Sequence, residues 1–215
     1  MAKSWVNGEF DRQVETLVGL GYPSLIAHGG SSFRRLVEPV RERLQAAASS
    51  ALLPRDLEQT RERVAFVVVI GRKQVSVTQT MPLTSLGGRA GWVSADTADI
   101  DRFEPIDAVE VPDPDAYALI DVSRGEDTLG VRPNDAIVTI IEAGRSPLTV
   151  DEGVAFVTHF PDSLEKNHCF QLLASRVGDK RVPGIWISER RPKLGFCWAG
   201  NLHTWLGAAS CAARV

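Results

Sequence analysis

Two stretches near the N-terminus repeat apolar residues with the period of an amphipathic helix. In the first, from Gly8 to Leu20, these residues are Phe10, Val14, Leu17 and Val18, and Gly21 would end the helix. In the second they are Phe33, Leu36, Val37, Val40 and Leu44. Pro39 lies inside the second pattern, so we expect either a kink there or two short helices that meet at the proline.

Two segments rich in β-branched residues follow. Residues 63–70 form a short and almost wholly apolar run closed by Gly71, which predicts a strand buried on both faces in the middle of a sheet. Residues 74–80 alternate Val and Gln with Ser and Thr, which predicts a half-exposed strand. Residues 86–91 are rich in glycine, and we expect a loop there.

The middle of the chain changes from an acidic stretch to a pair of helices. Between Ser94 and Asp127 the acidic residues far outnumber the arginines, and the prolines there exclude a long helix. We therefore expect this stretch to form a solvent-exposed acidic flank. A strand is predicted at residues 117–122. Pro133 suits the first position of a helix that ends at Gly144.

The second helix of the pair has a clear start and end. Thr149 and Glu152 have the spacing of a capping box, in which each side chain bonds to a backbone amide of the other residue. The helix must end before Pro161. His159 falls in its last turn, where a charged imidazole would favour the negative end of the helix dipole.

From Cys169 onward, alternation replaces the helical period. Residues 169–176, 183–189 and 194–199 predict an antiparallel meander, and the tail after them is expected to fold back. The whole pattern predicts an α+β fold with N-terminal helices, a mixed but mainly antiparallel sheet, a helix pair and this three-stranded meander. We expect a single domain of residues 1–215, and any seam would lie within 82–115, between parts 1–81 and 116–215.

The overall composition is that of a globular protein. The 215 residues are 44% hydrophobic and 24% charged, which excludes a disordered or collagen-like chain. The net charge of −3 provides no positive field, so we expect no nucleic-acid partner. No apolar run has the length of a membrane span or signal peptide, so we expect no membrane partner and a cytoplasmic location, where the three cysteines stay reduced.

The C-terminal stretch 197–211 concentrates the residue types that carry chemistry. A thiol is a nucleophile or a soft ligand, tryptophan offers a stacking face, and histidine titrates near neutral pH. The interpretation that we favour is a pocket for a small polar or anionic molecule in a ligand-binding or regulatory domain. Its predicted ligand-binding residues are Trp198, Asn201, His203, Thr204, Trp205, Arg176 and Arg181.

Three other interpretations stay open. A hydrolase or transferase would use Cys197 or Cys211 as nucleophile and His203 as base, oriented by Asn201 or Asp179. Zinc would accept the same cysteines and histidine with a fourth ligand from the start of the meander. Their spacings match no compact ligand pair, however, so we expect no metal and no cofactor. Finally, the tryptophans and cysteines could fill the core beneath a closing loop.

Several short motifs together carry a family resemblance. They are Phe10-Asp11-Arg12-Gln13-Val14, Leu20-Gly21-Tyr22-Pro23, Lys166-Asn167, Cys169-Phe170, Ser175-Arg176, Gly178-Asp179, Arg181-Val182-Pro183 and the tail 197–211. Over nearly its whole length the chain resembles an actinobacterial family, the domain of unknown function 5701. The resemblance implies an actinobacterial, cytosolic origin and brings no activity, cofactor or catalytic residue with it. The departures from the family lie at variable positions such as Leu202.

Overall fold

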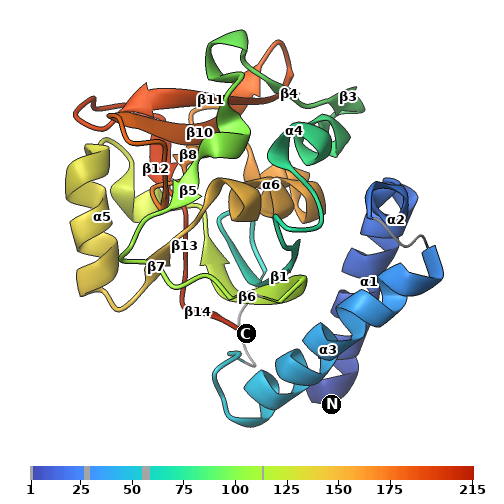
Figure 1. The fold of residues 1–215 in the computed structure, drawn as a ribbon. Coiled ribbons are helices and arrows are strands. Elements are labelled where there is room, and N and C mark those ends of the chain that lie inside the picture. The colour runs from blue at the N-terminus through green and yellow to red at the C-terminus, as the bar shows by residue number, and fades with distance from the viewer. Residues whose placement is uncertain (1, 27–29, 55–58, 113) are drawn as a thin grey trace.

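The structure is a computed structural model, which describes residues 2–26, 30–54, 59–112 and 114–215. Its helices and two larger, mainly antiparallel sheets form an α+β fold, as predicted (Figure 1). The N-terminal helices lie together on one side, and the sheets with the other helices form the larger body. None of the helices in the described part of the chain combines the length and apolar character that a membrane span requires.

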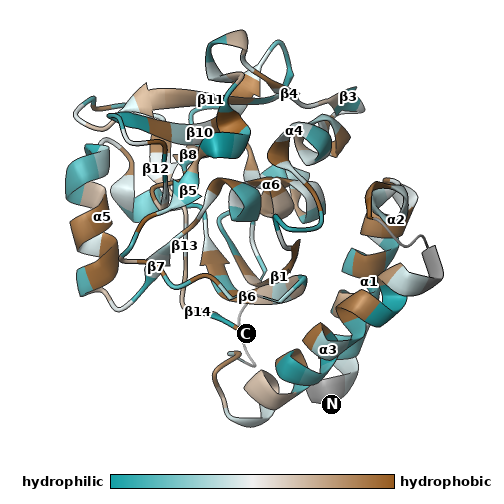
Figure 2. Cartoon of the chain, in the orientation of Figure 1, coloured by the Kyte–Doolittle hydropathy of each residue, from teal (hydrophilic) through white to brown (hydrophobic). Residues whose placement is uncertain are grey.

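The N-terminal region is a hairpin of α1 (Ala2–Gly19) and α3 (Gly30–Ser49), joined through the short α2 (Tyr22–Leu25). Apolar and polar residues lie on different sides of these helices (Figure 2). Phe10 is fully buried. Both predicted helices are confirmed. However, α3 continues through Pro39, so the division into two short helices is wrong. The buried stripe that runs past the proline outweighs the loss of one backbone hydrogen bond.

The first sheet joins strands that are far apart in the sequence. Its spatial order is β1 (Arg63–Ile70), β6 (Ala116–Ser123), β13 (Ser210–Cys211) and β7 (Ser146–Pro147), with β14 (Ala213–Arg214) also paired to β6. β1 and β6 are antiparallel along nearly their whole length. β1 is buried on both faces, as predicted, but it lies at the edge of this sheet, so its predicted central position is wrong.

The second sheet contains the predicted meander. β8 (Cys169–Gln171), β10 (Arg181–Ser188) and β11 (Arg191–Trp198) are consecutive antiparallel neighbours, which confirms the prediction. β12 (Leu206–Ala208) pairs parallel with β8, and β4 (Trp92–Val93) pairs parallel with β11. The tail then crosses to the first sheet as β13 and β14, so its predicted return is confirmed and it links the two sheets.

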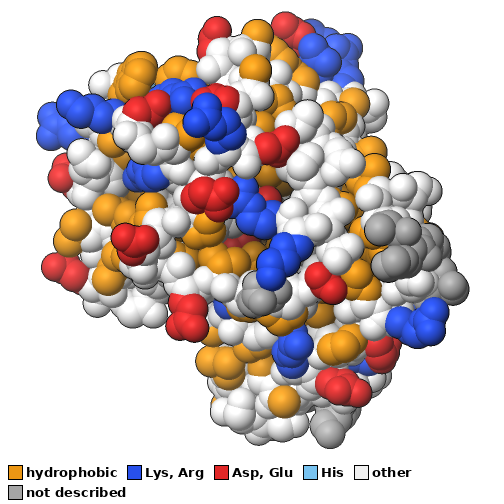
Figure 3. Space-filling view, viewed as in Figure 1, with side chains coloured by type: hydrophobic (Ala, Val, Ile, Leu, Met, Phe, Trp, Pro, Cys, Tyr) orange, Lys and Arg blue, Asp and Glu red, His pale blue; other side chains and the backbone are white. Residues whose placement is uncertain are grey.

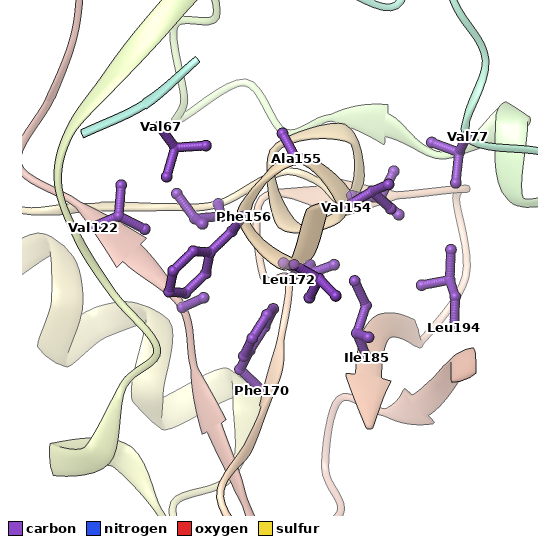
Figure 4. Packing of buried hydrophobic residues seen from close by; sticks show 14 of the residues in the cluster. Val67, Val77, Val122, Val154, Ala155, Phe156, Phe170, Leu172, Ile185 and Leu194 are labelled. Atoms are coloured by element: carbon purple, nitrogen blue, oxygen red, sulfur yellow. The ribbon is translucent and has the colours of Figure 1, made fainter. Parts of the chain in front are cut away.

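The helix pair consists of α5 (Pro133–Glu142) and α6 (Val150–His159), as predicted. The capping box at the start of α6 forms in full. α6 is buried in the main core, where Phe156 stacks on Phe170 of β8 with ring centroids 5.5 Å apart (Figure 4). α6 therefore forms the central contact of the core between the sheets.

Side chains from two helices cover the open edge of β1. Gln13 of α1 donates from Nε2 to the Phe66 carbonyl (3.0 Å) and accepts at Oε1 from the Val68 amide (2.8 Å). The Nε2 of His159 lies 2.9 Å from the Val68 carbonyl, to which it donates. These bonds take the place of a further strand, and they explain how an edge strand can be buried.

His159 is neutral in this position. Burial lowers the pKa of its imidazole to about 3, because a charged ring would lose its hydration there. The predicted interaction of a charged imidazole with the helix dipole is therefore wrong. The ring serves the edge of β1, which lies far from it in the sequence.

The segment after β1 differs from the prediction. Residues 77–80 form the short helix α4 (Val77–Thr80) instead of a strand. Ser76 and Gln79 form a capping box there, which satisfies the first amides locally, whereas a strand would need a partner strand. β2 (Ser85–Leu86) and β3 (Arg89–Ala90) form a hairpin instead of the predicted loop, and the two glycines of its turn supply the positive φ that it requires.

The remaining elements are short. They are the 3₁₀ helices η1 (Met81–Leu83), η2 (Ala95–Thr97), η3 (Ile100–Arg102), η4 (Glu126–Thr128) and η5 (Pro161–Ser163), and the strand pair β5 (Glu104–Pro105) with β9 (Ser175–Arg176). Most of the stretch 82–115 consists of these elements and loops. β1 and β6 pair with each other from the two sides of this stretch, and the single-domain organisation stays a prediction.

Candidate functional site

Most of the tail residues predicted to bind a ligand lie at the surface. Trp198 is 48% exposed at the end of β11. Asn201 and Thr204 are exposed in the turn that follows. His203 is half-buried and contacts Trp205 edge on, with ring centroids 5.5 Å apart. Arg181 lies opposite Trp198 in the β10–β11 register, and the Asn201 amide donates to the Trp198 carbonyl (2.9 Å). Of the predicted ligand-binding residues, Trp205 lines the cavity described below.

The three thiols are free and buried, and they are divided between the two sheets. Cys169 and Cys197 lie in the second sheet and Cys211 lies in the first. Burial raises the pKa of Cys197 to about 11 and of Cys211 to about 12, and it also raises the pKa of Cys169. Burial therefore disfavours the reactive thiolate at neutral pH. Across the described ranges, no three His, Cys, Asp or Glu side chains are placed to hold a metal ion.

The two predicted anion-binding arginines are engaged inside the protein. Arg181 forms a bidentate ion pair with Asp99 (2.8 and 2.7 Å) and another bond with Asp179 (2.8 Å), and these hydrogen bonds raise its pKa. Arg176 donates from Nη1 to two nearby backbone carbonyls at 2.7 and 2.8 Å, and burial lowers its pKa. Neither guanidinium lines the cavity that contains Trp205.

One cavity of about 400 Å³ joins the tail to the second sheet. It is lined by Lys166, Asn167, Cys169, Trp186, Ile187 and Trp205, and we call it the Trp186–Trp205 cavity. Trp186 of β10 meets Trp205 edge to face, with ring centroids 6.0 Å apart and 76° between the ring planes. Both tryptophans are partly exposed, so part of each ring is open to a ligand.

Backbone hydrogen bonds hold the walls of this cavity in place. The amide at the start of β8 donates to the Trp205 carbonyl (3.1 Å), which fixes the tail against the sheet. Glu165 and His168 exchange two backbone bonds of 3.2 and 3.0 Å and close the turn that presents Lys166 and Asn167. The φ of Asn167 is 67°, a left-handed conformation that asparagine tolerates. The exposed Lys166 therefore sits at the tip of an ordered turn.

A row of aromatic and cationic side chains continues from the cavity across the second sheet. Lys193 of β11 lies between Trp92 and Trp186, with Nζ 4.9 and 5.4 Å from their ring centroids. The three residues are direct neighbours on adjacent strands. Arg191 covers Trp92 at 5.1 Å. Arg191 is also paired with Glu189 (2.8 Å). The sheet beside the cavity therefore carries aromatic rings and the Lys193 ammonium, which favours anions.

Trp205 was predicted from the sequence as a ligand-binding residue, whereas Trp186 and Lys166 were not. A signal for Trp186 was available, because the register of the hairpin from β10 to β11 places it opposite Lys193. Nothing in the sequence predicts the contact between Trp186 and Trp205. It depends on the parallel pairing of β12 with β8, which the residue pattern does not encode.

Comparison with known proteins places the chain in a family. The sequence model of a family of unknown function, DUF5701, matches residues 16–215. The chain belongs to this family. The DUF5701 match begins within α1 and includes both sheets and every residue of the Trp186–Trp205 cavity. No curated protein and no solved structure matches the chain.

Proposed function

We propose that this DUF5701 protein is a cytoplasmic ligand-binding or regulatory domain that binds a small planar anion in the Trp186–Trp205 cavity. The observation that carries the proposal is the pair of partly exposed tryptophans at the wall of a 400 Å³ cavity, with the exposed Lys166 at its rim. The open parts of both rings lie beside the Lys166 ammonium, so the cavity combines a stacking face with a cation. The three free thiols suit a reducing cytoplasm.

The lining supplies the contacts that such a ligand needs. A planar ring gains contact area and stacking energy on an indole at little cost in conformational entropy. The ammonium group of Lys166 would attract a carboxylate or phosphate, and the amide of Asn167 can donate to the same group. The volume lies within the usual range for small-molecule sites. This chemistry matches a ligand that is apolar on its faces and anionic at one end.

The alternative, a hydrolase or transferase with a cysteine nucleophile and His203 as base, has less support. Cys169 lines the cavity, but its Sγ donates to the Glu165 carbonyl (3.3 Å) and its pKa is raised by burial. His203 contacts the ring of Trp205. In the described part of the chain no hydrogen bond links His203 to a cysteine sulfur.

The test is the binding of 2-naphthoate, followed by tryptophan fluorescence and by calorimetry. We expect saturable binding that weakens about fivefold or more in Trp205→Leu and in Lys166→Met, because each removes a contact worth about 1 kcal/mol or more. Trp198→Leu and Lys180→Met are matched controls, since both residues are exposed and neither lines the cavity. The neutral alcohol 2-naphthalenemethanol should bind more weakly.

Two results would contradict this proposal. One is the absence of saturable binding by 2-naphthoate in the wild-type protein. The other is an equal loss of affinity in the control variants, which would place the ligand elsewhere on the surface.

A further inference from the structure

A second hollow of about 180 Å³ lies between the end of β1, the strand β5 and the start of α6. Among its lining residues are Arg72, Glu104, Tyr117, Thr149 and Asp151, and we call it the Asp151 hollow. It shares no residue with the Trp186–Trp205 cavity. Figure 3 shows a depression near the centre of this face of the molecule, with acidic and basic side chains side by side at its rim.

The carboxyl group of Asp151 is the unusual feature of this hollow. It lies in the first turn of α6, partly buried, and it also lines a narrow apolar crevice formed by residues such as Val68, Ile70 and Val154. Within the described residues, no other side chain forms a hydrogen bond or an ion pair with it. A buried acid ordinarily has such a partner.

The neighbouring acid, Glu152, differs from Asp151 because its carboxylate has several bonding partners. Its side chain is completely buried and is fully satisfied by a bidentate ion pair with Arg214 (2.6 and 2.8 Å), by the Tyr117 hydroxyl (3.0 Å) and by the Thr149 amide (2.7 Å). Glu152 therefore belongs to the fold. Asp151, one residue earlier, has none of these contacts and faces the hollow.

The basic groups at the rim are already engaged. The guanidinium of Arg72 donates to Glu104 (2.6 Å) and to the Asp101 carbonyl (3.1 Å). Lys73 has an interaction of its own as well. The two bonds of Arg72 go to Glu104 and Asp101 and not to Asp151, so the Asp151 carboxylate keeps acceptor capacity that faces the hollow.

Burial raises the pKa of Asp151 to about 6. Arg72 and a hydrogen bond from the backbone of Asp151 itself act against this rise, while Glu152 and Asp101 add to it. The charge of Asp151 therefore lacks a compensating partner, which a cation in the hollow would supply.

We propose that the Asp151 hollow binds a small primary ammonium ion with a short alkyl chain. The ammonium group donates to the Asp151 carboxylate and to the remaining lone pair of the Tyr117 hydroxyl, and the alkyl chain lies toward the apolar crevice. The mouth is polar and the inner wall is apolar, which matches a molecule with one cationic end. An anion would instead face an unpaired carboxylate.

The other titratable groups around the hollow keep the expected pH dependence simple. They are Arg72, Lys73, Asp101, Glu104, Tyr117 and Glu152. Tyr22 faces the crevice. Burial raises the pKa of Tyr22 to about 12 and that of Tyr117 well above its ordinary value, so both stay protonated between pH 5 and 7.5. The variant Asp151→Asn keeps all these groups and removes only the carboxyl that we invoke.

The experiment titrates the protein with propylammonium chloride at constant ionic strength and follows amide chemical shifts by NMR. We expect saturable binding with a dissociation constant on the order of 1–10 mM for so small a ligand. Affinity should fall about tenfold in Asp151→Asn, and about tenfold in the wild type at pH 5, where about a tenth of this carboxyl is ionised. Asp135→Asn, at an exposed aspartate in the first turn of α5, should bind like the wild type.

Three outcomes overturn the proposal. The first is no saturable binding of propylammonium. The second is equal binding in Asp151→Asn, or equal binding by 1-propanol, because the carboxylate would then play no part. The third is tighter binding by propionate, which would make the hollow an anion site.

Discussion

The replacement of Asp151 by asparagine is expected to stabilise the folded protein at neutral pH and to leave its stability unchanged in acid. Burial raises the carboxyl pKa from 3.8 to about 6. This difference corresponds to about 2–3 kcal/mol, which the folded protein loses when the group ionises. Between about pH 4 and 6 the folded state binds the proton more tightly than the unfolded chain, so the free energy of unfolding falls as the pH rises through this window.

Urea denaturation at pH 4 and at pH 7.5 measures this effect. At pH 4 the aspartic acid is protonated in the folded state, and the variant should match the wild type. At pH 7.5 the variant should be more stable by about 2–3 kcal/mol, because asparagine has no charge to bury. Asp135→Asn is the matched control, and it should lose a few tenths of a kcal/mol through the dipole of α5. A gain that is absent, or equal at both pH values, would refute the reasoning.

Two further predictions concern the rest of the molecule. Gln13→Ala leaves the Phe66 carbonyl and the Val68 amide without partners at the buried edge of β1. Urea unfolding should therefore show a free energy of unfolding lower by about 2–5 kcal/mol. The control is Gln45→Ala, at a partly buried side-chain contact between α1 and α3, which should lower it by about 1 kcal/mol or less. All three cysteines should react with Ellman's reagent much more slowly in the folded protein at pH 7 than in urea, because burial raises the thiol pKa. A thiol that reacts rapidly in the folded protein would instead support the cysteine-nucleophile alternative.

The candidate sites could be predicted from the sequence only in part. The tail tryptophan Trp205 was identified because Trp, His and Cys are concentrated in residues 197–211. Asp151 had no distinguishing signal, since an aspartate in the first turn of a helix is ordinary. Its raised pKa arises mainly from burial, and the groups around it come from distant segments, such as the residues after β1, η3 and β5.

The sequence by itself determined the local elements of this protein. The apolar stripes of α1 and α3, the capping box and ends of α6, and the alternation in the meander each depend on residues a few positions apart, so they can be read without the fold. The Ser76–Gln79 capping box has the same local character, although its alternating residues favoured a strand.

Only the tertiary structure decided which of these elements meet. The edge position of β1 follows from pairings with β6 and from Gln13, which bonds to Phe66 across 53 residues. The charge state of His159 follows from its burial against the same edge. The physical reason is that burial, and the loss of water as a hydrogen-bond partner, depend on what the fold places opposite a group, whereas caps and turns satisfy their own backbone.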